Sequence, residues 1–138
     1  MKKIHFALVG AGKMGTRWAF VISKNAGSTL DVIVDRNPEK ARGLATQIPG
    51  CLAAKDISEV LKNKNIDAVL IAVPHISLAP ITSLALRLGK HVLCEKPGAN
   101  RSEQIKKNIV LARKKGLVYK IGYNYRFHDG FIKARRLY

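Results

Sequence analysis

Three glycines near the start of the chain have the spacing of a phosphate-binding turn. Gly10, Gly12 and Gly15 form a Gly-x-Gly-x-x-Gly pattern that directly follows an apolar run and opens a segment of helical period. Gly10 permits a tight turn, Gly12 lets the backbone approach a pyrophosphate, and Gly15 allows close helix–strand packing. Free N–H groups and the helix dipole would then meet the anion. We assign Lys13 and Met14, which lie between the last two glycines, to the same predicted site.

A carboxylate follows at the end of the second predicted strand. Asp35 stands about twenty residues after the glycines, where a carboxylate can bind the ribose hydroxyls of adenosine and repel a 2′-phosphate. Arg36 beside it could instead pair with a 2′-phosphate. The sequence therefore predicts NAD as the cofactor and leaves NADP open. In a purely structural alternative, the glycines form an ordinary turn and Asp35 caps the helix that starts at Pro38.

The elements that position these residues alternate along the chain. Apolar runs of strand length and segments of helical period follow one another, which is typical of a parallel sheet covered by helices. Strands are expected at 3–9, 30–34, 51–53, 68–73, 91–94 and 117–122, and helices at 13–24, 38–47, 57–62, 76–88, 102–115 and 129–138. Asp56 and Ser102 are expected to cap two of these helices. The predicted fold class is α/β, a doubly wound and mostly parallel Rossmann-like sheet in three layers.

Composition narrows the class of protein. The chain has 138 residues, 47% of them hydrophobic, which is enough for one domain with a core. The longest apolar run, 68–74, is far shorter than the roughly 20 residues of a membrane span, and no signal peptide is recognisable, so a cytoplasmic protein is expected. Cys51 and Cys94 have no metal-site spacing and are expected to be buried free thiols. The net charge of +16 raises the question of a nucleic-acid partner.

Four segments together resemble the Gfo/Idh/MocA-type oxidoreductases. They are the glycine turn, VDRNPEKA at 34–41, GKHVLCEKP at 89–97 and GYNYRF at 122–127. The resemblance implies that residues 1–122 are a dinucleotide-binding domain. It also implies that residues 123–138 start the junction to a second domain, outside this chain, that carries the substrate pocket and the surface for oligomer contacts.

The resemblance also implies roles for particular residues. Lys96 would lie near the nicotinamide and the substrate hydroxyl, where an ammonium can assist proton removal, and it is the predicted catalytic residue. Glu95 would lie at the cofactor, and Pro97 would follow a cis peptide bond. Val73 and Pro74 match the loop of the fourth strand that lies against the cofactor.

The resemblance assigns no single role to three further residues. Tyr125 and Arg126 match the family's Tyr-Arg-Phe segment and would line the nicotinamide end, or else pack on the second domain. His75 stands where the family often has an Asn-x-x-His, but the pattern is incomplete, and we expect a surface histidine at a helix start. The family's downstream Asp and His have no counterpart in this chain. No metal ligand is predicted.

The sequence thus predicts the NAD(P)-binding domain of an oxidoreductase that transfers hydride between nicotinamide and a sugar- or polyol-like carbon. We expect this chain to bind the cofactor without turnover, and a homo-oligomer is left open. One alternative is a basic Rossmann-like module that binds nucleic acid or a protein, and another is an inactive truncated copy of the enzyme. Nucleic acid is the less favoured partner, because the basic helix 102–115, with Ile105, Ile109 and Ala112 toward the core, has no aromatic residues on its charged face.

Overall fold

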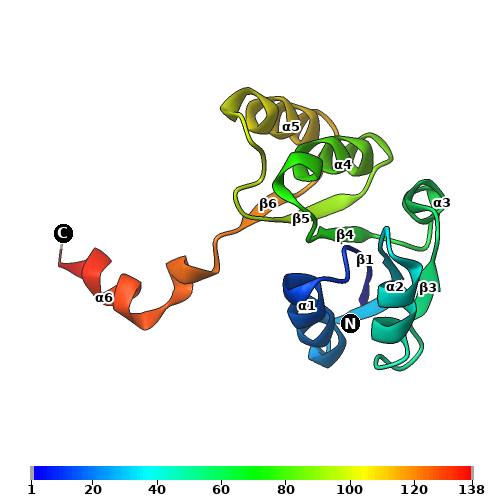
Figure 1. The fold of residues 1–138 in the computed structure, drawn as a ribbon. Coiled ribbons are helices and arrows are strands. Elements are labelled where there is room, and N and C mark those ends of the chain that lie inside the picture. The colour runs from blue at the N-terminus through cyan, green and yellow to red at the C-terminus, as the bar shows by residue number, and fades with distance from the viewer. Residues whose placement is uncertain (1, 138) are drawn as a thin grey trace.

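The computed structural model describes residues 2–137. Six strands form one sheet in the order β3-β2-β1-β4-β5-β6, and every neighbouring pair is parallel (Figure 1). The strands are β1 (Ile4–Val9), β2 (Ser28–Val34), β3 (Leu52–Ala54), β4 (Ala68–Ile71), β5 (His91–Glu95) and β6 (Tyr119–Gly122). The helices are α1 (Lys13–Lys24), α2 (Pro38–Ala45), α3 (Ile57–Lys62), α4 (His75–Arg87), α5 (Ser102–Lys114), the 3-10 turn η1 (Asn124–Phe127) and α6 (Asp129–Arg136). The predicted α/β fold class and order of elements are confirmed.

Apart from the 3-10 turn η1, which was not predicted, the differences from the predicted elements lie at their ends. β4 stops at Ile71, where its pairing ends on both sides, with Val9 of β1 and Cys94 of β5. The prediction that Ser102 caps α5 is wrong. Arg101 holds the cap position, and no side chain of the described residues closes that end. Asp56 does cap α3, since its side chain accepts a hydrogen bond from the Ser58 N–H.

Helices cover the two faces of the sheet in two separate groups. α1 and α2 pack on β1, β2 and β3, whereas α4 and α5 pack together over β4, β5 and β6 (Figure 1). On the first side Leu8, Ile33 and Leu70 are fully buried, and on the second side Val69 and Ile71 are. β4 therefore contributes to both cores, and a continuous aliphatic run is typical of a strand that is buried on both faces.

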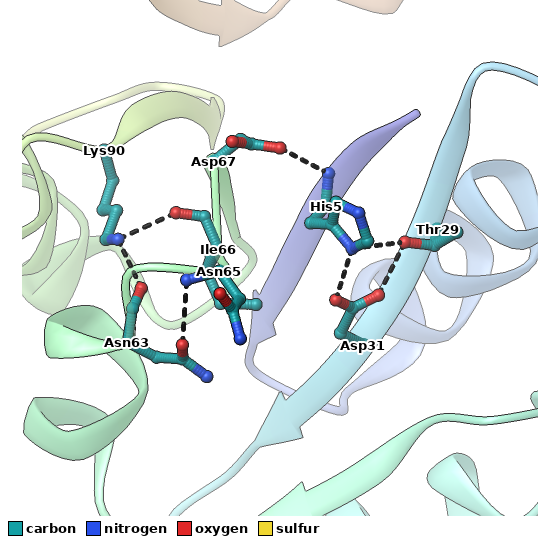
Figure 2. Close-up of polar contacts among 8 residues, drawn as sticks. All are labelled: His5, Thr29, Asp31, Asn63, Asn65, Ile66, Asp67 and Lys90. Carbon is teal, nitrogen blue, oxygen red and sulfur yellow. Dashed lines mark hydrogen bonds and ion pairs between the residues drawn. The ribbon is translucent and has the colours of Figure 1, made fainter. Parts of the chain in front are cut away.

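Polar side chains align the strands at their amino ends (Figure 2). The His5 N–H donates to Asp67 Oδ2 over 3.0 Å, and His5 Nδ1 lies 2.7 Å from Asp31 Oδ2. Lys90 is buried, and its ammonium donates to two carbonyls of the 63–66 loop at 2.6 and 2.8 Å. The hydrogen bond from the His5 N–H lowers the pKa of Asp67, and burial lowers the pKa of Lys90. These contacts connect neighbouring strands and loops at the amino end of the sheet, which is opposite the glycine turn.

The last described residues leave the body of the domain. η1 and α6 contain no buried residue, and α6 extends away from the sheet at the red end of the chain (Figure 1). Tyr123, Tyr125, Phe127, Phe131 and Leu137 are between 52% and 84% exposed. Tyr138, the last residue of the helix expected at 129–138, lies outside the described residues. In the part of the chain that is described, no helix combines the length and apolar character needed to cross a membrane.

The two cysteines are both free thiols. Cys94 is buried as predicted, but Cys51 is only half-buried, because it lies before the short edge strand β3. Burial raises the pKa of each thiol to about 11, so both are neutral at pH 7.

Candidate dinucleotide site

The glycine turn connects β1 to α1 at the carboxyl end of the sheet. Gly10 has a φ of 101°, and a Cβ there would overlap the carbonyl oxygen of Ala72. A Cβ on Gly15 would overlap the carbonyl oxygen of Gly10. Both positions therefore require glycine for packing alone.

Gly12 differs from these two glycines. No heavy atom of the described residues lies within 4 Å of the place where its Cβ would be. Gly12 is also the N-cap of α1, where no side chain of residues 2–137 accepts a hydrogen bond from the first turn. That turn has no acidic residue, Lys13 is exposed, and Met14 is partly buried. Open space and free N–H groups at a helix N-terminus are what a pyrophosphate needs.

Asp35 supports this turn from the end of β2. Its Oδ2 accepts a hydrogen bond from the Ala11 N–H over 2.7 Å, and its Oδ1 accepts one from the Asn37 N–H over 2.8 Å. The alternative in which Asp35 caps α2 is wrong, because Asn37 is the cap and its side chain accepts from the Glu39 N–H. Each carboxylate oxygen keeps a further lone pair, which is available to a ribose hydroxyl.

A cavity of about 470 Å³ lies over the ends of β1, β2 and β4. This is where the strand order reverses, and open parallel sheets bind their ligands at such a point. Six of the predicted site residues line it, namely Gly10, Gly12, Asp35, Arg36, Val73 and Pro74. The cavity thus brings the predicted pyrophosphate turn and the predicted ribose carboxylate together.

Sequence reasoning did not identify two cations of this cavity. Lys40 in the first turn of α2 and Lys55 after β3 line it together with Arg36. Among the described residues none of the three forms an ion pair. Lys55 could have been found from its place at the carboxyl end of a strand, but β3 is so short that the sequence barely marks it.

Lys96 and Glu95 lie at the end of β5, next to β4, and do not line this cavity. Lys96 is exposed. The predicted cis bond between Lys96 and Pro97 is present. Burial raises the pKa of the neighbouring Cys94 thiol to about 11 and that of the Tyr119 hydroxyl to about 12, so neither group is charged at pH 7.

The Glu95 side chain lies inside the protein, with 6% of the residue exposed. Its Oε1 accepts a hydrogen bond from Trp18 Nε1 over 2.7 Å, and its Oε2 accepts one from the Lys96 N–H over 3.1 Å. A direct contact between Glu95 and the cofactor stays a prediction. Nothing in the sequence indicated the contact with Trp18, because the two residues are 77 positions apart.

Tyr125 and Arg126 belong to η1. The Tyr125 ring is 75% exposed and lies 6.3 Å from the Phe131 ring, measured between centroids. Arg126 lines a second cavity of about 430 Å³ whose walls include Trp18 and Ile109. Their contact with the nicotinamide end stays a prediction. His75 is exposed at the start of α4, as expected.

The basic residues of α5 are all exposed, as on an ordinary solvated helix. The prediction that Ile109 faces the core is wrong, because this side chain is 36% exposed and lines the second cavity. Asn108 takes the buried position instead, where its Nδ2 donates to the Ala79 carbonyl over 3.2 Å.

Comparison with known proteins decides the family. The model of an oxidoreductase family with an NAD-binding Rossmann fold, GFO_IDH_MocA, matches residues 4–123. The chain belongs to this family. The Gfo/Idh/MocA resemblance of the four sequence segments is therefore confirmed, and the domain is an NAD-binding Rossmann domain.

Individual members of the Gfo/Idh/MocA family are similar over nearly the whole chain. A dTDP-3,4-didehydro-2,6-dideoxy-alpha-D-glucose 3-reductase of Streptomyces violaceoruber is 37% identical over 86% of this chain and 34% of its own length. An inositol 2-dehydrogenase of Mycolicibacterium gilvum is 29% identical over 99% of this chain and 40% of its own length. GenD2 from gentamicin A biosynthesis, solved with NAD, is 27% identical with a TM-score of 0.94, covering 99% of this chain and 39% of that one. The chain thus spans about two-fifths of the length of these proteins.

Proposed function

We propose that this chain binds NAD as the cofactor part of an oxidoreductase that transfers hydride between nicotinamide and a carbon of a sugar- or polyol-like substrate. The observation that carries the proposal is the open space at Gly12, beside the uncapped end of α1 and in one cavity with Asp35. The substrate class is supported by similar proteins named as a sugar 3-reductase and as inositol 2-dehydrogenases.

Different residues of the chain would bind different parts of the cofactor. The N–H groups of the first turn of α1 would hold the pyrophosphate, and Asp35 would accept hydrogen bonds from the adenosine ribose. Asp35 is also hydrogen-bonded to the Ala11 N–H, so the ribose carboxylate and the pyrophosphate turn keep a constant spacing. Val73 and Pro74 would form an apolar wall on the β4 side of the bound cofactor.

Lys96 is the proposed catalytic residue of the complete enzyme. The nicotinamide, when bound, supplies the hydride chemistry. With the adenosine end bound by Asp35 over β2, the other end of the cofactor would extend over β4 and β5, where Lys96 follows the last strand residue. Among the described residues the Lys96 ammonium makes no ion pair, so it is free to polarise a substrate oxygen.

We further propose that residues 123–138 form the junction to a substrate domain and that turnover needs this domain. The described part of this segment presents exposed aromatic side chains and no buried residue. Beside it lies the second cavity, whose walls are mostly apolar and include Leu93, Ile105 and Ile121. Apolar surface of this kind is typical of a face that another domain covers.

NAD is the proposed cofactor in preference to NADP. The carboxylate of Asp35 would repel a 2′-phosphate, whereas Arg36, Lys40 and Lys55 would attract one. Asp35 is held in place by two hydrogen bonds, while none of the three cations has an ion-pair partner among residues 2–137. The fixed carboxylate therefore favours NAD, and weaker binding of NADP is expected.

Titration of the chain with NADH and NADPH tests the proposal. Trp18 is the single tryptophan, and it lies on the helix that follows the glycine turn. Energy transfer from Trp18 to the reduced nicotinamide should appear with NADH at lower concentration than with NADPH, and NADH should raise the melting temperature. If neither dinucleotide changes the fluorescence or the melting temperature, the proposed function is wrong. Steady reduction of NAD by this chain with myo-inositol or another polyol would contradict the need for a second domain.

A further inference from the structure

We propose that Trp18 and Glu95 are positioning residues that hold the Lys96 turn against the helix that binds the pyrophosphate. The inference rests on the proposed function. The buried carboxylate of Glu95 does not line the cavity that holds the glycine turn and Asp35. Neither side chain is assigned a contact with the reacting atoms, and both act through Lys96.

Glu95 is a buried acidic residue. A carboxylate that leaves water is unfavourable unless hydrogen bonds replace its hydration. Glu95 is 6% exposed, and it forms no ion pair among the described residues. Its two oxygens are instead satisfied by two N–H donors, one on Trp18 and one on Lys96. Hydrogen bonds to an ionised acceptor are stronger than neutral ones and hold their geometry more tightly.

The two donors belong to different parts of the proposed site. Trp18 lies on α1, one to two turns after the glycine turn proposed to bind the pyrophosphate. Lys96 is the first residue after β5. The carboxylate therefore ties the helix that binds one part of the dinucleotide to the turn that lies over the other part. Since the indole and the carboxylate are both partly or fully enclosed by protein, this connection cannot readily be replaced by water.

Neighbouring residues enclose Glu95 and the Lys96 turn closely. Glu95 pairs with Gly122 of β6, and a Cβ on Gly122 would lie 3.6 Å from Glu95 Oε1. β6 thus lies directly against the carboxylate. On the other side of the turn, the Tyr123 hydroxyl donates to the Pro97 carbonyl over 3.5 Å. The Lys96 turn is held at both ends, and the Glu95 end is the buried one.

The experiment compares two ligands, NADH and ADP-ribose, by calorimetric titration of the 138-residue chain. ADP-ribose has the adenosine and pyrophosphate but no nicotinamide, so the ratio of the two affinities reports the nicotinamide end alone. Trp18→Phe keeps an aromatic ring but removes the N–H donor. Glu95→Gln keeps the size of the side chain. It replaces Oε2, which accepts a hydrogen bond from the Lys96 N–H, by an NH2 group that can only donate.

Both variants should lower the ratio of NADH to ADP-ribose affinity by about tenfold, with ADP-ribose affinity unchanged within about twofold. The double variant should show no larger effect than either single one, because both remove the same connection. Ile22→Ala is the matched control, since Ile22 is buried on the same helix in the core with Leu8 and Leu30, and its apolar side chain donates no hydrogen bond to Glu95. It should lower the melting temperature and leave the ratio unchanged.

A proton–nitrogen NMR spectrum gives a second measurement that does not depend on ligand. The single indole N–H signal should exchange slowly with water and should move in Glu95→Gln. An indole signal that does not move, or an affinity ratio that stays constant while the melting temperature falls, overturns the positioning role. If the unmodified chain binds neither NADH nor ADP-ribose, the proposed function fails and this inference fails with it. Binding of ADP-ribose with a constant ratio in the variants would overturn this inference alone.

Discussion

Replacement of Gly12 by alanine separates cofactor binding from folding. Gly12 has φ −79° and ψ −171°, which alanine adopts without strain, and its Cβ would contact no described residue. Restricting the unfolded chain should stabilise the variant by about 0.4–1 kcal/mol. The poorer N-cap preference of alanine should cost about the same. The free energy of unfolding should therefore change by less than about 1 kcal/mol.

The effect on binding should be much larger. The added methyl group occupies the space beside the free N–H groups of α1, so a pyrophosphate would be displaced from them. Loss of two hydrogen bonds to a charged group, at about 1.5 kcal/mol or more each, amounts to about 3 kcal/mol. That corresponds to a roughly 100-fold rise in the Kd for NADH.

The assay is calorimetric titration with NADH together with urea unfolding of the same preparation. Gly15→Ala is the contrasting variant, because its Cβ would overlap the carbonyl oxygen of Gly10. We expect this variant to lose about 2 kcal/mol or more of stability as well as binding. Wild-type NADH affinity in Gly12→Ala would refute the placement of the pyrophosphate, and a loss of stability as large as that of Gly15→Ala would refute the claim of open space.

Three further outcomes are expected. Asp35→Ser should raise the ratio of NADPH to NADH affinity at least about tenfold, because it removes the carboxylate that repels a 2′-phosphate; an unchanged ratio in a fluorescence titration would contradict its role. Burial raises the pKa of Cys94 from 9.0 to about 11, so the stability that the neutral thiol provides is complete below pH 9 and is lost as the pH rises through 11. Urea unfolding should show that the free energy of unfolding falls by about 3 kcal/mol between pH 9 and pH 11 because of this group. In Cys94→Ala the free energy of unfolding should fall less over the same pH range. Lys90→Met should lower the free energy of unfolding at pH 7 by about 2 kcal/mol, because two loop carbonyls lose a charged donor, and a urea midpoint equal to that of the wild type would exclude this.

Much of the fold could be predicted because its signals are local. The glycine spacing, the apolar run of β4 and the cap at Asp56 depend on neighbouring residues, and each is present in the structure. Gly89 has a φ of 79° and directly follows Leu88, the C-cap of α4. Glycine is the usual residue in this left-handed position after a helix. The order of strands and helices follows from these signals and from the right-handed connection of parallel strands.

The predictions for Ile109 and Ser102 are wrong because at these positions the local sequence pattern and the tertiary contacts disagree. Helical spacing placed Ile109 toward the core, but the buried position belongs to Asn108, whose side chain finds an acceptor on α4. Ser102 has a good residue type for a cap, yet the chain enters the helix one position earlier. Neither outcome can be read from the segment itself, because each depends on how α5 meets its surroundings.

The sequence by itself determined the family, the parallel α/β fold and the pair formed by the glycine turn and Asp35, since these depend on residue types at short spacing. Only the tertiary structure decided that Asp35 holds the turn and does not cap α2, because that depends on which N–H groups its oxygens meet. It also decided that Lys40 and Lys55 share the cavity with Arg36. The contact between Trp18 and Glu95 likewise needed the fold, because a buried carboxylate is satisfied by whichever donor the packing brings to it, however distant in the chain.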